Sequence, residues 1–89
     1  MIFEYDKRKS CTNKEKHGID FEEAKELWKD IELVQLSAKT EHEQRYICIG
    51  LINEKYWTAI ITYRSEKIRI ISVRRSREKE IELYENDNI

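Results

Sequence analysis

The feature that most constrains the fold of this chain is a change in the spacing of its apolar residues. Phe21, Ala24, Leu27 and Trp28 recur every three or four positions, whereas the apolar residues after Ile31 mostly occupy every second position. The first spacing is that of a helix with one buried face, and the second is that of β-strands. The sequence therefore predicts helices in the first third of the chain and a sheet in most of the remainder.

The expected elements follow from this pattern and from capping residues. Asp6 and Asp20 stand where helix N-caps are expected, and Gly18 stands where a helix ends in the left-handed conformation. Ile31 should complete the buried face of the second helix, and Ser76 should cap the last one. By residue number we expect a short strand at 3–5, helices at 7–17 and 21–29, strands at 31–36, 44–52, 56–63 and 67–73, and a closing helix that ends near residue 86.

The lengths of the chain and of its connections complete the fold prediction. Short segments at 53–55 and 64–66 separate three of the expected strands, so these neighbours should run antiparallel. A chain of 89 residues is too short for two cores, so residues 1–89 should form a single domain. The predicted fold is α+β, with two N-terminal helices, a four-stranded antiparallel sheet and a C-terminal helix.

The composition excludes several classes of protein. Charged residues make up 39% of the chain, and there are no prolines and two glycines, which excludes collagen-like chains and flexible linkers. No apolar run approaches the length of a membrane span and the N-terminus has no signal-peptide core, so we expect a cytoplasmic protein. Cys11 and Cys48 have no metal-binding spacing and should be free thiols. Such a thin core is typical of a domain that has a partner.

The net charge of −1 conceals a strongly basic segment. Residues 44–79 contain nine basic and three acidic side chains, whereas residues 20–43 contain three basic and eight acidic ones. This segregation is compatible with a local site for a polyanion, and also with charged faces that serve only to solvate a small domain.

The basic segment contains the candidate anion-binding residues. Arg69 lies among isoleucines in an expected central strand, where its guanidinium needs an anionic partner. That partner could be an acid such as Glu4 or Glu32, or a substrate phosphate. Strict alternation would place Arg69 and Arg74 on opposite faces of the strand. Arg74 and Arg75 lie at the junction with the closing helix, whose N-terminus also attracts anions.

The first expected helix carries the candidate proton-transfer groups. Lys9, Asn13, Lys16 and His17 share one side of this helix, which has no apolar stripe to pack. His17 could serve as an acid or base near neutral pH, or could only complement the dipole at the end of the helix. A set of His, Lys and Arg side chains without a metal or cofactor motif suits metal-independent cleavage of RNA, in which the substrate's 2′-hydroxyl attacks the adjacent phosphate.

Two blocks of the sequence then stand out together. The first runs from Phe3 to Ala24 and contains the string KHGIDFEEA, and the second runs from Arg45 to Tyr84 and contains IRIISVR. In this order, and over nearly the whole chain, they resemble the BrnT toxins of bacterial type II toxin–antitoxin systems.

The resemblance implies a RelE-like ribonuclease fold and cleavage of mRNA that arrests growth. It also implies neutralisation by a BrnA-like antitoxin with a ribbon-helix-helix domain. The toxin–antitoxin complex would bind promoter DNA only through this antitoxin. Transferred to this sequence, the catalytic residues would be Lys16, His17, Arg64 and Arg69, and the phosphate-binding ones Arg74 and Tyr84, to which we add Arg75 because of its position. No cofactor is expected. Two alternatives are a non-catalytic module that binds nucleic acid or an antitoxin, and a small structural subunit with Arg69 in a buried ion pair.

Overall fold

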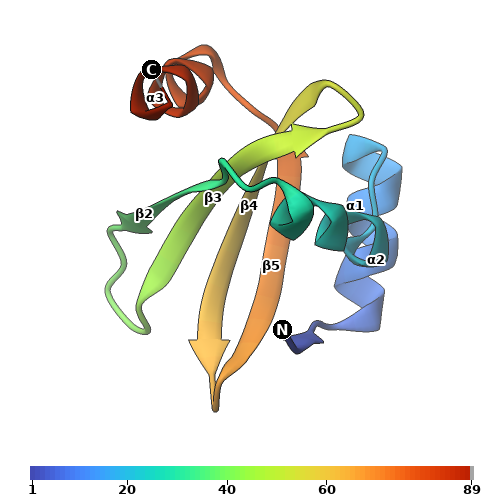
Figure 1. Cartoon of the computed structure of the whole chain (residues 1–89). Coiled ribbons are helices and arrows are strands. Elements are labelled where there is room, and N and C mark those ends of the chain that lie inside the picture. The colour runs from blue at the N-terminus through green and yellow to red at the C-terminus, as the bar shows by residue number, and fades with distance from the viewer. Residues whose placement is uncertain (89) are drawn as a thin grey trace.

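The computed structural model describes residues 1–88 and is built around one twisted sheet (Figure 1). Its strands lie in the order β1-β5-β4-β3-β2. Three helical segments at the N-terminal end lie against one face, and the last helix covers one end of the other face. The elements are β1 (Phe3–Glu4), α1 (Lys7–His17), α2 (Phe21–Ala24), the 3₁₀ helix η1 (Lys25–Lys29), β2 (Val34–Ala38), β3 (Arg45–Ile52), β4 (Lys55–Arg64), β5 (Lys67–Arg75) and α3 (Glu78–Asp87).

The α+β class is confirmed, but the prediction of four antiparallel strands is wrong. The sheet has five strands and is mixed, because Phe3 and Glu4 pair in parallel with Ile68 and Arg69 of β5. The remaining neighbours are antiparallel, as expected from their short connections. A strand of two residues whose partner lies more than sixty positions away leaves only a faint local signal, so its place in the sheet could not be read from the sequence.

Helix α1 begins and ends where predicted, but it docks through polar groups. The side chain of Asp6 accepts hydrogen bonds from the backbone of Arg8 and Lys9, and Gly18 has a left-handed φ of 78°. Buried Asn13 donates to the carbonyl of Val73 at 2.8 Å and accepts from the backbone N–H of the same residue at 3.2 Å. The amide of Asn13 thus takes the place of a neighbouring strand along the part of β5 that β1 is too short to cover.

The buried face of the second helical segment is confirmed except at its last position. Phe21 and Leu27 are buried against the sheet, whereas Ile31 is 98% exposed. The reason is a turn at Asp30, where η1 ends and a carboxylate oxygen accepts the backbone N–H of Glu32. This turn places Ile31 in solvent. It also moves the start of β2 from residue 31, where it was expected, to Val34.

Both predicted hairpins are present, and the expected cap of the last helix is not. The two turns place Asn53 and Glu54, and Ser65 and Glu66, at positive φ. The N-cap of α3 is Arg77 rather than Ser76, whose hydroxyl lies 2.8 Å from that of Thr58.

Candidate functional site

A register shift in the sheet gathers two of the candidate arginines on one face. Ile61 pairs with Ile70, but Ile60 pairs with Ser72, so Ile71 is an extra residue in β5. Because side chains alternate along a strand, this β-bulge reverses the faces that follow it. Arg69 pairs with Thr62 and Arg74 pairs with Thr58, and these two positions of β4 share a face. The expectation of opposite faces for Arg69 and Arg74 was therefore wrong.

The bulge lies beside a hollow that contains the candidate proton-transfer groups. This α1–β5 hollow has a volume of about 220 Å³, and it is lined by Lys9, Thr12, Asn13, Lys16, His17, Ile71 and Ser72. Both Lys16 and His17 are exposed there, on the last turn of α1. Ser72 pairs with Ile60, midway between the partners of Arg69 and Arg74. At a rise of about 3.3 Å per residue, each arginine branches from the sheet about 7 Å from Ser72 along the strand.

Arg74 is held by the most developed ion pair of this face. Its guanidinium donates to both carboxylate oxygens of Glu80 at 2.8 Å, and the two side chains are 21% and 13% exposed. Glu80 also accepts from the backbone N–H of Arg77 and the hydroxyl of Thr58. Although burial alone would raise the pKa of the Glu80 carboxyl, these hydrogen bonds and the charge of Arg74 lower it to about 2. The bidentate contact fixes the plane of the guanidinium.

Arg69 and Arg64 also pair with glutamates, in looser contacts. Arg69 donates to Glu4 at 3.0 Å, and both side chains remain more than a quarter exposed. Glu4 is one of the two acids that the sequence offered as partners of Arg69, as the alternative to a substrate phosphate, and the structure shows this ion pair. Arg64 lies at the end of β4 and contacts Glu43 at 3.2 Å. It is four residues beyond Ile60 along β4, which places its backbone about 13 Å from the level of Ser72.

Two other predicted site residues lie away from the hollow. Arg75 pairs with Trp57 on the opposite face from Arg74, and its guanidinium lies 5.4 Å from the centre of that indole ring. Tyr84 is buried between α3 and the sheet, where its hydroxyl donates to Asp30 at 2.9 Å. Burial and this contact with a carboxylate raise the pKa of the phenol. The structure therefore places Lys16 and His17 in the α1–β5 hollow, and Arg69 and Arg74 on either side of Ser72 along β5, with Arg64 further along the face of the two arginines.

Sequence reasoning missed the residues that hold this site in place. Asn13 was noted only as part of a polar helix face, and Glu80 was not considered as a residue of the site. The spacing of Arg77 and Glu80 does indicate where Glu80 lies, because a glutamate three residues after an N-cap commonly accepts a hydrogen bond from the backbone N–H of the N-cap residue. No comparable pattern indicates that Asn13 reaches β5 across 60 positions of sequence.

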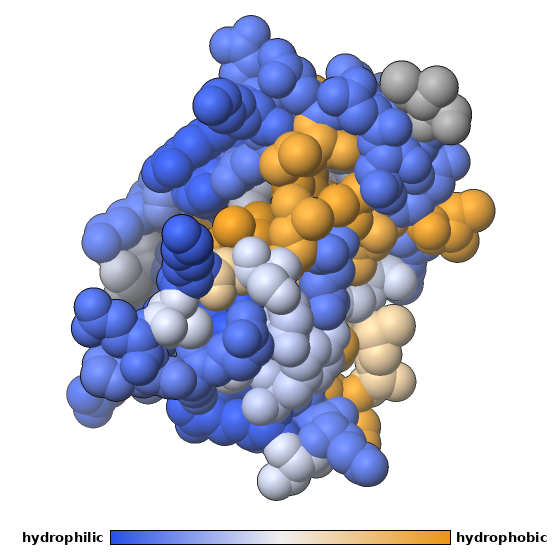
Figure 2. Space-filling view, turned by 90° about the vertical axis from the view of Figure 1, so that its left-hand side faces the viewer, coloured by the Kyte–Doolittle hydropathy of each residue, from blue (hydrophilic) through white to orange (hydrophobic). Residues whose placement is uncertain are grey.

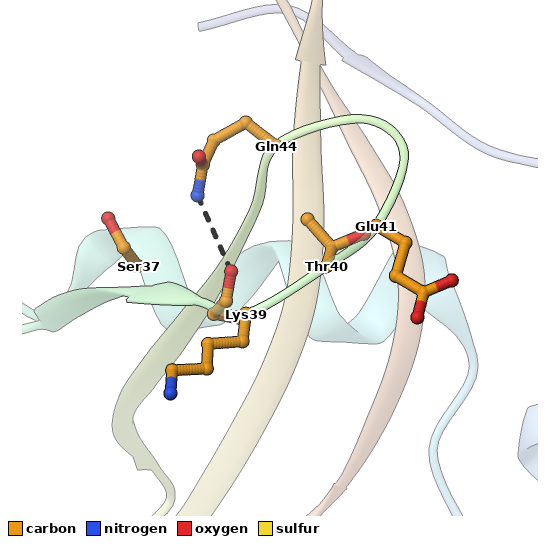
Figure 3. Close-up of a pocket in the computed structure, with 6 residues that line it drawn as sticks. Ser37, Lys39, Thr40, Glu41 and Gln44 are labelled. Carbon is orange, nitrogen blue, oxygen red and sulfur yellow. Dashed lines mark hydrogen bonds between the residues drawn. The ribbon is translucent and has the colours of Figure 1, made fainter.

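A second, larger hollow contains none of the predicted site residues. It lies at the loop between β2 and β3, where Gln44 donates to the carbonyl of Ala38 at 3.5 Å (Figure 3).

Both cysteines are free thiols, as predicted. Within residues 1–88, no three His, Cys, Asp or Glu side chains come together in a way that could hold a metal ion. The helices of this part of the chain are all too short or too polar to cross a membrane.

A small α+β domain with arginines along one face of its sheet, and with His and Lys beside them, is equipped to bind a polyanion such as RNA. Comparison with known families gives the same result. The family described as "Ribonuclease toxin, BrnT, of type II toxin-antitoxin system" matches residues 5–80. The chain belongs to this BrnT family, and it is a ribonuclease toxin of a type II toxin–antitoxin system. RNA is its substrate and an antitoxin protein is its partner. No curated protein sequence matches the chain.

Proposed function

We propose that this toxin cleaves RNA at the α1–β5 hollow, by attack of the substrate's own 2′-hydroxyl and without a metal ion. The observation that supports this site most directly is the placement of His17 and Lys16 in the same hollow as Ser72, with Arg69 and Arg74 on either side along β5. The reaction needs a base, an acid and cations close to one phosphate, and these residue types supply all three.

In the proposed mechanism the proton-transfer groups are His17 and Lys16. One group removes the proton of the 2′-hydroxyl, whose oxygen then forms a bond to phosphorus. The bond from phosphorus to the 5′-oxygen breaks, and that oxygen receives a proton. The products are a 2′,3′-cyclic phosphate and a 5′-hydroxyl. Arg69 and Arg74 bind the phosphate oxygens, where charge develops during the attack.

The other predicted residues have a more distant role or none in phosphate binding. Arg64 lies on the face of Arg69 and is assigned to a phosphate further along the same RNA strand. We assign no phosphate contact to Arg75, because it stacks near Trp57 on the other face. We assign a structural role to Tyr84, because its hydroxyl already donates a hydrogen bond to Asp30.

We also infer the wider context from the family. The fold is proposed to be RelE-like, with residues 1–89 as one domain, and the toxin is proposed to arrest growth by cutting mRNA in the cytoplasm. Its antitoxin is proposed to be BrnA-like, with a ribbon-helix-helix domain, and promoter DNA is proposed to be bound only through that antitoxin.

The test is cleavage of labelled single-stranded RNA by the purified toxin in excess EDTA. We expect cleavage to survive the chelator, to leave 2′,3′-cyclic or 3′-phosphate ends, and to stop when the antitoxin is added. A 2′-deoxy substitution at the cleaved position should block the cut, because the attacking group is then missing. Cleavage that disappears in EDTA and returns with Mg²⁺ would overturn the proposed mechanism.

Matched variants separate the site from the rest of the surface. His17→Gln should slow cleavage by about 10²- to 10⁴-fold, the usual contribution of an acid or base, whereas His42→Gln in the exposed β2–β3 loop should not. Arg74→Gln should weaken cleavage, while Arg75→Gln, a change of the same kind on the opposite face, should have little effect. Full activity in both His17→Gln and Lys16→Gln would show that RNA is not cleaved at the α1–β5 hollow.

A further inference from the structure

The two edges of the sheet are protected to very different degrees. At the β5 edge, β1 pairs with the lower part of the strand and the Asn13 amide bonds to Val73 above it. At the other edge, β2 pairs only with β3, and no strand in residues 1–88 lies on its outer side. An open edge of this kind exposes backbone N–H and C=O groups that can pair with another chain.

The composition of β2 makes this open edge more unusual. Proteins commonly protect edge strands with lysine, other charges or proline. Here 39% of all residues are charged, yet β2 reads VQLSA and is the one strand among the five described that has no charged residue. The five-residue strand is therefore unpaired on one side and unprotected by sequence.

An apolar track leads from this edge toward the α1–β5 hollow. Leu36 pairs with Ile47, Ile47 pairs with Ile60, and Ile60 pairs with Ser72, so these four residues form one row across the sheet. Leu36 is 37% exposed, and Ile47 and Ile60 are only partly buried, because α3 covers the neighbouring row at Val34 and Ile49 instead. Figure 2 shows apolar side chains gathered in a patch on the side of the molecule that contains β2 and α3, surrounded by hydrophilic ones.

The ends of the edge add two features that a partner could use. The hollow at the β2–β3 loop begins at Ser37 and Ala38, at the end of the open edge (Figure 3). At its other end, Asn88 bonds to the carbonyl of Glu32, which brings the end of α3 close to the start of β2. Exposed acids lie in this region, including Glu32 and Asp87. A complementary segment would be extended, with apolar alternate residues and basic ones beside Glu32.

We propose that the antitoxin adds a strand to the sheet at β2 and continues along the row of Leu36, Ile47 and Ile60 to cover the α1–β5 hollow. The distance from β2 to β5 is three strand spacings, about 14 Å, which four or five extended residues can span. A single segment can therefore both pair with the edge and block access to Arg69 and Arg74. Docking at β2 rests on the antitoxin partnership alone, whereas the covering of the hollow also rests on the proposed function.

The test compares two substitutions of the same kind at opposite edges of the sheet. Leu36→Lys places a charge in the centre of the proposed docking edge, and Ile2→Lys places one beside β1, where the side chain is 61% exposed. Binding of the purified cognate antitoxin is measured by calorimetry, and RNA cleavage is measured without antitoxin. We expect Leu36→Lys to weaken antitoxin binding at least tenfold with unchanged cleavage, and Ile2→Lys to alter neither. Wild-type affinity in Leu36→Lys would overturn the proposal.

Hydrogen exchange and sedimentation distinguish strand addition from other occupants. In the complex, the amides of residues 34–38 should exchange more slowly than in the free toxin, because new backbone hydrogen bonds form there. Unchanged exchange would show that the antitoxin does not pair with β2. The free toxin should sediment as a monomer, and a dimer that Leu36→Lys dissociates would instead identify the edge as a self-interface. If the toxin fails to cut RNA but still binds its antitoxin through β2, the catalytic proposal fails and docking at β2 stands.

Discussion

Glu80 is predicted to be the acid on which the arginine face depends most. It is 13% exposed and accepts four hydrogen bonds, two from Arg74 and one each from Thr58 and the backbone of Arg77. The substitution Glu80→Gln keeps the shape of the side chain and one carbonyl oxygen. It removes the negative charge and turns one acceptor into a donor that faces the guanidinium of Arg74.

The size of the effect follows from the pKa of Glu80. This pKa falls from 4.5 to about 2 in the folded protein, and each pKa unit corresponds to about 1.4 kcal/mol. The ionised carboxylate therefore stabilises the folded state by about 3 kcal/mol at neutral pH. Because the glutamine retains part of the hydrogen bonding, we expect Glu80→Gln to lower the free energy of unfolding by about 2 kcal/mol. For a domain of this length, that loss lowers Tm by roughly 10 °C.

The same pKa fixes the pH range in which the difference appears. A carboxyl with a lowered pKa contributes its full stabilisation above its unfolded value of 4.5, and loses it as the pH falls toward 2. Urea unfolding followed by tryptophan fluorescence should thus separate Glu80→Gln from wild type by a constant amount between pH 7 and 5, and by less at pH 3. Glu78→Gln, on an exposed residue of the same helix, is the matched control. Equal losses in the two variants, or a difference that persists unchanged at pH 3, would refute the reasoning.

Three further predictions concern the backbone and the thiols. Gly50→Ala should destabilise the protein by about 1–2 kcal/mol, because the Cβ of the alanine would lie 2.9 Å from a leucine methyl group. An unchanged midpoint in urea unfolding would contradict the packing described. Glu54→Gly should stabilise it by about 0.5–1 kcal/mol, since Glu54 has a φ of 65°, and a lower Tm would show that no strain is present. A thiol reagent should modify exposed Cys11 and leave Cys48 of the native protein unmodified, because burial raises the pKa of the Cys48 thiol to about 12. Two modified thiols in mass spectrometry would disprove this.

Local sequence determined most of the secondary structure, because the signals involved lie within a few residues of each other. Asp6 and Gly18 bound the first helix as expected, and the capping box of Asp20 and Glu23 begins the second. Both hairpins and the free thiols also followed from the sequence. At Ile31 the local reasoning failed, because the hydrophobic period cannot reveal a turn that a side chain of Asp30 stabilises.

What only the tertiary structure decided is which residues share a surface. The bulge at Ile71 moves Arg69 and Arg74 to one face, and a bulge depends on how two strands pair rather than on either strand alone. The contact of Asn13 with Val73 joins residues 60 positions apart, and no periodic pattern encodes such a pair. The sequence offered both Glu4 and Glu32 as partners of Arg69, and only the packing selected Glu4. The sequence by itself thus determined the elements, the chemical groups and the family resemblance. The packing of those elements decided where the groups meet, because side-chain direction in a sheet depends on strand register and on the partner across each edge.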